Sequence, residues 1–138
     1  MDKLVGKTKD AGFQIGVRRT LPITKEEAWE RLMSPDGLKL WLGDIDELKL
    51  EKGQLYGTSD GSSGEVRVVK PQEQLRMTWQ RKGWEQPSTV QIRLLSASTG
   101  TTVSFHQEKL ADSAVREEMK LRWERAIAGL SEAAGVRG

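Results

Sequence analysis

The chain has 138 residues, among them 22 lysines and arginines, 20 aspartates and glutamates and no cysteine. A chain of this length fits one domain around one hydrophobic core. Without cysteine it has no disulfide, thiolate nucleophile or zinc–thiolate site. Its charges are interspersed and sum to only +2, which argues against nucleic acid as a partner. No apolar run is long enough for a membrane-spanning helix.

Residues 1–12 are polar, and we expect a flexible N-terminal tail there. The first ten residues lack the apolar segment of a secretion signal, so the cytoplasm is the expected compartment. From Phe13 to about Leu21, apolar and polar side chains alternate, which is the period of a half-buried strand.

Two short helices are predicted after this strand. Thr24 and Glu27 have the spacing of a capping box, in which each side chain accepts a hydrogen bond from the other residue's backbone N–H. The Ser-Pro-Asp-Gly segment at residues 34–37 ends the first helix. A second helix is expected over residues 38–42, with Gly43 as its C-cap.

Five strands and a long helix are predicted in the remainder of the chain. Turn residues separate the strands, for which we expect the ranges 53–58, 64–70, 73–80, 88–97 and 101–110. From about Ser113, apolar side chains recur every three or four residues, which is the stripe of a helix that packs on a sheet. Gly135 is expected to end this helix, and residues 136–138 to form a short tail.

These elements predict one α+β domain over residues 13–135. The expected architecture is the helix-grip fold, a curved antiparallel sheet of six strands around a long C-terminal helix, with two short helices after the first strand. Met77 and Trp79 alternate with polar residues on one strand, and Val103 and Phe105 do so on another. Such side chains should face one common interior.

Several segments, taken in order, resemble one family of this fold. They are residues 19–23 (RTLPI) leading to Ala28-Trp29, Trp41, residues 64–66 (GEV), Pro71, residues 75–79 (LRMTW), residues 100–103 (GTTV) with His106, and Trp123 with Leu130. Over about residues 14–134 the chain resembles the family related to the activator of the ninety-kilodalton heat-shock chaperone ATPase, within the SRPBCC or START/Bet v superfamily.

This resemblance implies a hydrophobic cavity between the sheet and the final helix. Relatives can hold lipids, sterols, polyketides or other apolar molecules there, and some relatives are cyclases, aromatases or co-chaperone domains. Many members carry a glycine immediately before the closing tryptophan, where this chain has Arg122. A glycine would let the helix lie close to the sheet or would widen a cavity, so Arg122 bears directly on the pocket volume.

The candidate ligand contacts are the large side chains expected to face this interior. They are Trp41, Tyr56, Val66, Met77, Trp79, Ile92, Phe105, Met119 and Trp123. The three tryptophans come from distant segments, and a buried indole N–H needs an acceptor that a ligand or a water could supply. The alternative is packing in an ordinary core, which is the commoner role of such aromatic sets.

The polar candidates outside this set carry less weight. Trp84, in the loop at residues 81–87, is either exposed or folded over the mouth of the grip. Arg67 is, besides Tyr56 of that set, the polar side chain expected to reach the interior. His106 should point to solvent, because it alternates with Phe105, and no residue in the sequence is placed to orient it as a base.

No catalytic residue, cofactor or metal is assigned from the sequence. Asp44, Asp46 and Glu47 could form only a carboxylate magnesium site, and a solvated loop is the commoner arrangement of such residues.

The leading hypothesis is a domain that binds a small apolar or amphipathic ligand, such as a lipid, sterol or polyketide-like molecule, under the final helix. The alternative is a co-chaperone-like domain with a packed cavity, whose partner would be a chaperone or another protein. The chaperone activators of this family pair this domain with a second one. We therefore regard stimulation of a chaperone ATPase as the less expected form of this alternative. A cyclase-like or aromatase-like enzyme ranks third, and a monomer is expected.

Overall fold

The computed structural model describes residues 7–8, 12–45 and 47–133. Gly135 and the predicted tails lie outside the described residues, apart from the short strand at residues 7–8 and the start of the next strand at residue 12. The strands of the described residues, in chain order, are β1 (Lys7–Thr8), β2 (Gly12–Leu21), β3 (Leu55–Gly57), β4 (Ser63–Lys70), β5 (Gln74–Trp79), β6 (Ser88–Ala97) and β7 (Gly100–Leu110). The helices are α1 (Lys25–Met33), α2 (Pro35–Trp41) and α3 (Ser113–Ala133).

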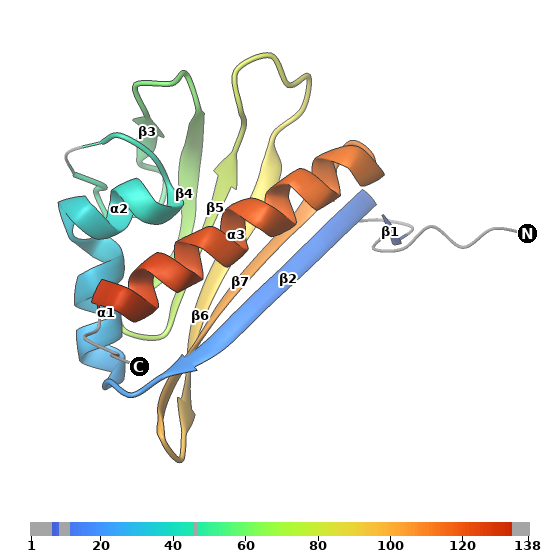
Figure 1. Ribbon diagram of the computed structural model, residues 1–138. Helices are drawn as coiled ribbons and strands as arrows, with labels where there is room; N and C mark the ends of the chain where they lie inside the picture. Colours follow the sequence, from blue (N-terminus) through green and yellow to red (C-terminus); the bar gives the residue numbers. More distant parts are fainter. Residues whose placement is uncertain (1–6, 9–11, 46, 134–138) are drawn as a thin grey trace, which may run out of the picture.

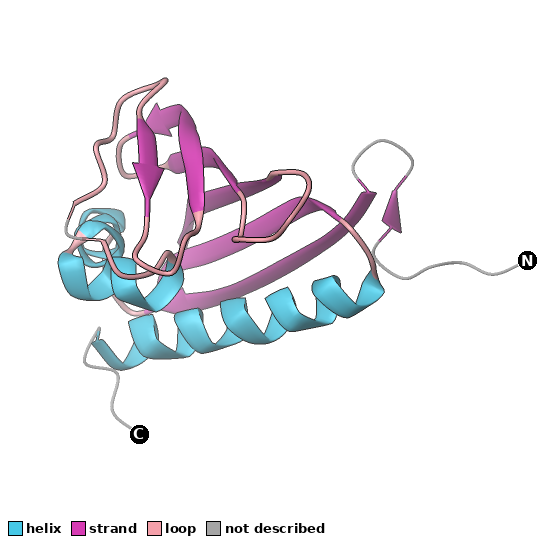
Figure 2. Cartoon of the chain, turned by 90° about the horizontal axis from the view of Figure 1, so that it is seen from above, coloured by secondary structure: helices cyan, strands magenta, loops and turns pink. Residues whose placement is uncertain are grey.

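One antiparallel sheet contains all of these strands, in the order β1-β2-β7-β6-β5-β4-β3. The sheet curves around α3, which crosses its inner face, while α1 and α2 pack near the C-terminal end of α3 (Figures 1 and 2). The predicted helix-grip architecture is therefore confirmed, with the two-residue β1 added at the edge of the six expected strands. None of the described helices is both long and apolar enough to cross a membrane.

The inner face of the sheet is formed by the residues whose alternation predicted it. Met77 on β5, Ile92 on β6 and Phe105 on β7 are each 0% exposed. Ile92 lies directly opposite Phe105 in the β6–β7 register. Because successive residues of a strand point to opposite faces, this register fixes one continuous apolar surface beneath α3.

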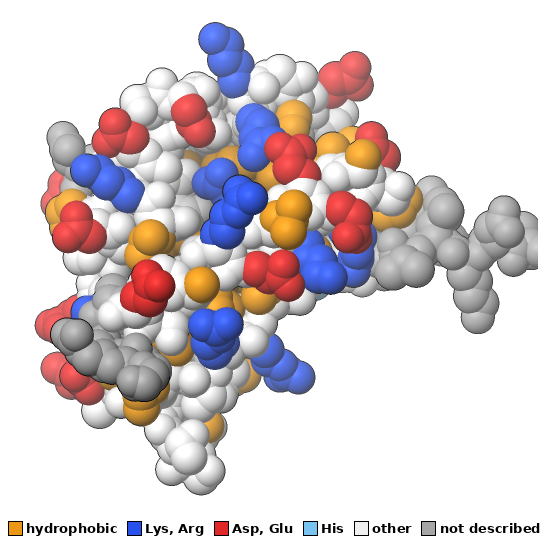
Figure 3. Space-filling model, viewed as in Figure 1, with side chains coloured by type: hydrophobic (Ala, Val, Ile, Leu, Met, Phe, Trp, Pro, Cys, Tyr) orange, Lys and Arg blue, Asp and Glu red, His pale blue; other side chains and the backbone are white. Residues whose placement is uncertain are grey.

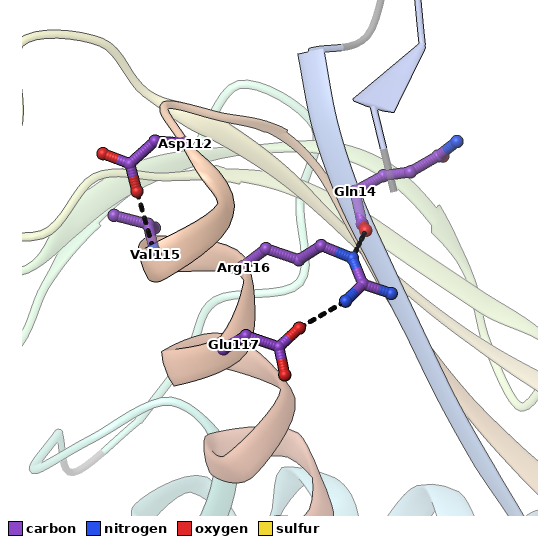
Figure 4. A network of polar contacts seen from close by, with 5 residues as sticks. All are labelled: Gln14, Asp112, Val115, Arg116 and Glu117. Atoms are coloured by element: carbon purple, nitrogen blue, oxygen red, sulfur yellow. Dashed lines mark hydrogen bonds and ion pairs between the residues drawn. The ribbon is translucent and has the colours of Figure 1, made fainter. Parts of the chain in front are cut away.

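The start of α3 is capped and fastened to the edge of the sheet (Figure 4). The Asp112 carboxylate accepts a hydrogen bond from the Val115 N–H at 2.8 Å, which satisfies one of the free donors of the first helical turn. The guanidinium of Arg116 donates to the backbone carbonyl of Gln14 on β2 at 2.8 Å and pairs with Glu117. These contacts fix where α3 begins its crossing of the sheet.

Both short helices begin at side-chain caps. The predicted capping box is confirmed, with Thr24 and Glu27 bonded reciprocally at 3.0 and 3.1 Å. The second helix begins at Pro35, three residues before the predicted start, so that expectation was wrong. Ser34 accepts from the Gly37 N–H at 3.1 Å, and proline at the first helical position needs no N–H partner. The Ser-Pro segment therefore both ends α1 and starts α2.

We expect Thr101→Val to lower the free energy of unfolding by about 1–2 kcal/mol. Thr101 is 1% exposed, and its hydroxyl donates to the Ile23 carbonyl at 2.8 Å, joining β7 to the turn before α1. Valine would leave that carbonyl without its donor. The matched control is Thr102→Val on the opposite face, whose partner is the exposed Thr20 hydroxyl. Urea unfolding of both variants checks this, and equal losses would contradict it.

Candidate functional site

All nine candidate ligand contacts lie in the interior of the grip. Tyr56 is the most exposed of them at 8%, and the others are exposed by 2% or less. Val66 pairs with Met77 across β4 and β5, and Met77 in turn lies opposite Val90 on β6. The structure therefore brings the set together, and in this conformation the side chains pack mainly against one another.

Aromatic contacts join the sheet to the helices at the centre of this set. Phe105 and Trp123 stack with ring centroids 4.9 Å apart and an interplanar angle of 14°. Trp41, at the end of α2, lies 6.4 Å from Phe105 in a tilted arrangement. One phenylalanine thus contacts the two helices that cover it, and such ring pairs add to the stability that burial alone supplies.

The three candidate tryptophans differ in how their indole N–H groups are satisfied. The Trp41 Nε1–H donates to the Leu32 carbonyl at 2.8 Å, which ties α2 to α1. The Trp123 Nε1–H donates to the Gln107 side-chain oxygen at 2.9 Å. The Trp79 Nε1–H is buried and has no hydrogen-bond partner in the described part of the chain. A buried donor without an acceptor costs stability, so this position calls for an explanation.

Gln107 is a polar interior residue that the sequence analysis missed. Its side chain is 0% exposed, accepts from Trp123 and donates to the Ser88 hydroxyl at 2.9 Å. The Ser88 hydroxyl in turn donates to the Trp79 backbone carbonyl at 2.6 Å. Alternation with Phe105 could have placed Gln107 on the inner face, but its amide needs partners that only the folded chain brings together.

Tyr56 folds over a glycine at the open edge of the sheet. Its hydroxyl donates to the Thr78 carbonyl, and burial raises the pKa of this phenol above its ordinary value. Gly64 lies opposite Tyr56 in the register, and a Cβ there would meet the Thr78 carbonyl oxygen at 1.9 Å. Only glycine therefore leaves room for the Tyr56 ring to cross the strand.

The prediction that Arg67 reaches the interior was wrong. Its side chain is 57% exposed and lies 3.9 Å from Glu65 on the outer surface. Val66 occupies the inner face immediately before it, and the β4–β5 register shifts between Val66 and Val68. The irregular pairing at this point leaves Arg67 on the solvent side.

Trp84 folds over the interior instead of pointing freely into solvent. Its half-buried ring meets Trp79 edge-on, with centroids 5.2 Å apart. Trp84 also lines a cavity of about 310 Å³ between the loop at residues 83–86, the end of β7 and the start of α3, with Lys109 and Val115 in its wall. Trp84 thus both lines this cavity and contacts the Trp79 indole.

Arg122 occupies space beside Trp79 on the side of α2. Its guanidinium carbon lies 4.8 Å from the Trp79 ring centroid and 5.7 Å from that of Trp123. A glycine at position 122 would leave this volume open. In this chain an arginine fills it and covers the indoles with a charged group.

The remaining polar candidates are His106 and the acidic residues at positions 44, 46 and 47. His106 is half-buried at the outer face, and one of its ring nitrogens lies 3.0 Å from the Gln14 side-chain oxygen. Asp46, a member of the conceivable magnesium set, lies outside the described residues. Among the residues that are described, no group of three or more histidine, cysteine or acidic side chains is arranged to hold a metal ion.

The geometry defines a helix-grip domain with an aromatic interior. Trp84 and Arg122 both contact the Trp79 ring in that interior. Residues 22–135 match the family described as Activator of Hsp90 ATPase homolog 1-like protein. The chain belongs to this family. No curated protein matches the chain.

Solved structures of the same fold include proteins of several kinds. CV1439 from Chromobacterium violaceum has a TM-score of 0.75 and 21% identity, over 90% of this chain and 98% of that one. PFC0360w, an HSP90 activator from Plasmodium falciparum, has a TM-score of 0.73 and 16% identity, over 88% and 96%. DynU16, a putative protein in the dynemicin biosynthetic locus, has a TM-score of 0.72 and 19% identity, over 86% and 46%. At these identities the similarity shows the shared fold.

We expect Trp123→Ala to lower the free energy of unfolding by about 3–5 kcal/mol, because it removes a large ring packed on Phe105. Leu121→Ala is the control on the same helix, since Leu121 is 53% exposed and surface changes cost less than about 0.5 kcal/mol. Chemical denaturation of both variants checks this. A loss for Trp123→Ala as small as that of the control would show that the ring borders open space.

Gln107→Leu should lower the free energy of unfolding by about 1–3 kcal/mol, because it leaves the Trp123 indole N–H without an acceptor in the interior. Gln91→Leu is the comparison, since Gln91 lies on the outer face of β6 and its side chain accepts from the Gln74 side chain. If the two substitutions cost the same in a denaturation experiment, the buried hydrogen bond does not stabilise the fold as described.

Proposed function

We propose that this protein binds a small apolar or amphipathic molecule between the sheet and α3, in contact with the aromatic interior. The observation that carries the proposal is the Trp79 indole N–H, which is buried and has no acceptor among the described residues. A ligand with one hydrogen-bond acceptor on an apolar body would satisfy this donor. Ligand sites of this type are apolar, with a few polar groups that fix the orientation of the ligand.

The proposed ligand enters past Trp84. In this conformation the interior is filled by its own side chains, so binding requires a side chain to move. Trp84 contacts Trp79 and also lines the cavity of about 310 Å³, on a loop where Gly83 has a φ of +91° and Glu85 is exposed. Rotation of the Trp84 ring would join the cavity to the Trp79 indole without displacing a strand or α3.

A second candidate is a protein-interaction domain of the co-chaperone type. The observation that favours it is the dense packing of the nine interior residues, which needs no ligand to complete it. The similarity in fold to an HSP90 activator from Plasmodium falciparum is consistent with this function. A protein partner would then contact the outer surface, and the interior would serve only stability.

Titration with fatty acids, sterols and flat aromatic compounds distinguishes the two candidates through the tryptophan indole signals in ¹H–¹⁵N NMR spectra. For the ligand-binding function, the Trp79 and Trp123 signals should shift saturably, and Trp84→Ala should change the affinity because that ring covers the entry. Trp29 on α1 is the internal control, whose signal should stay in place. A well-dispersed spectrum in which no compound shifts any indole would contradict ligand binding and favour the protein-interaction function.

A further inference from the structure

Arg122 is an interior-facing arginine whose hydrogen-bond partners are all neutral. One terminal nitrogen of its guanidinium donates to the carbonyls of Trp41 and Leu42, at 3.2 and 2.9 Å, at the end of α2. The guanidinium carbon lies over the Trp79 ring. Its Nε–H is buried and has no hydrogen-bond partner in the described residues. The side chain therefore has donors left over in a partly dehydrated environment.

This arginine also lacks a counter-charge in direct contact. Across the described residues, four other arginines lie within 4 Å of a carboxylate, namely Arg67, Arg76, Arg81 and Arg116. Among the described residues Arg122 makes no such ion pair, although it is only partly exposed, like Arg81 and Arg116. A cation withdrawn from water normally has an anionic partner, because neutral carbonyls replace only part of its hydration.

The surroundings of Arg122 carry an excess of positive charge. A hollow of about 270 Å³ lies between α2, α3 and the turn after β3, with Arg81, Arg122, Arg125 and Lys39 in its wall against Asp60 and Glu118. In the space-filling view, Lys and Arg side chains gather near the middle of the face that α3 crosses (Figure 3). The four cations exceed the two anions by two.

Both carboxylates in this hollow are already bound by other groups. Glu118 pairs with Arg81. Asp60 accepts from the Thr58 hydroxyl and from the Ser62 N–H, the latter at 3.0 Å, and these bonds hold the pKa of this carboxyl below its ordinary value. Among the described residues neither carboxylate forms an ion pair with Arg122, although the charges of both act on it from a distance.

We propose that this hollow binds an anionic group, a phosphate or a carboxylate, with Arg122 as the innermost contact and Arg81 and Arg125 beside it. The guanidinium of Arg122 offers an unused Nε–H, and arginine forms paired, charge-assisted hydrogen bonds to such groups. The proposal does not require an apolar ligand. If the ligand-binding function also holds, the two sites share Trp79, which Arg122 and Trp84 both contact.

The alternative role of Arg122 is purely structural, as a cation that caps the last carbonyls of α2. Burial and the neighbouring charge of Arg81 lower the pKa of the Arg122 guanidinium from its ordinary value, against the effect of Asp60. A structural cap of this kind would not bind added anions. Anion titration at constant ionic strength therefore separates the two roles.

The experiment follows the five tryptophan indole signals of the protein, assigned by single Trp→Phe variants, during titration with inorganic phosphate against sodium chloride of equal ionic strength. A second arm compares decanoate with decanol. We expect saturable shifts at Trp79 and Trp123 with phosphate or decanoate. Arg81→Gln and Arg122→Lys should each weaken binding about tenfold, the effect of losing one charge-assisted hydrogen bond, while Arg19→Gln, an exposed control with the same charge change as Arg81→Gln, should not.

Binding of phosphate identifies a free anion as sufficient, whereas binding of decanoate without phosphate identifies the head group of an amphipathic molecule. Both results support the anion site, and Arg125→Gln, at an exposed position, keeps the test valid if Arg122→Lys does not fold. Equal affinity for decanol and decanoate would overturn the proposal. The absence of saturable shifts with either anion, or an equal loss in Arg19→Gln, would overturn it too. An apolar ligand could still bind after such a result.

Discussion

The stack of Trp123 on Phe105 is the contact on which the interior of this protein depends. It places the middle of α3 against β7 with ring centroids 4.9 Å apart, and burial of two large rings is the main gain of that contact. The polar edge of the indole then requires an acceptor, which Gln107 supplies from the same strand. The position of α3 on β7 and the acceptor of the Trp123 indole N–H are thus set at one point.

The two other candidate tryptophans, Trp41 and Trp79, differ in whether the fold supplies an acceptor for the indole N–H. The Trp41 N–H is used inside the fold, where it bonds to α1. The Trp79 N–H has no hydrogen-bond partner in the described part of the chain, and its ring contacts both Trp84 and Arg122. The residues around Trp79 therefore combine an unpaired donor, an aromatic contact from the loop residue Trp84 and an excess of positive charge. These features make this end of the grip the candidate site.

The sequence allowed the fold to be predicted because its signals are local. Alternation placed Met77 and Phe105 on the inner face, and the Thr24 capping box marked the start of α1. The polar part of the site was not predictable in the same way. Arg122 acts through carbonyls about eighty residues away in the chain, and the missing partner of Trp79 is a property of packing that no local pattern records.

Relaxation-dispersion NMR of the ligand-free protein tests the central claim, that the Trp79 indole becomes accessible through movement of Trp84, most directly. This experiment detects exchange on the microsecond-to-millisecond timescale expected for such a movement. The account predicts exchange at the indoles of Trp84 and Trp79 and at the backbone of residues 83–86, with flat profiles at Trp41 and Trp123. Flat profiles at Trp84 and Trp79 as well would contradict it and would describe an interior that stays closed.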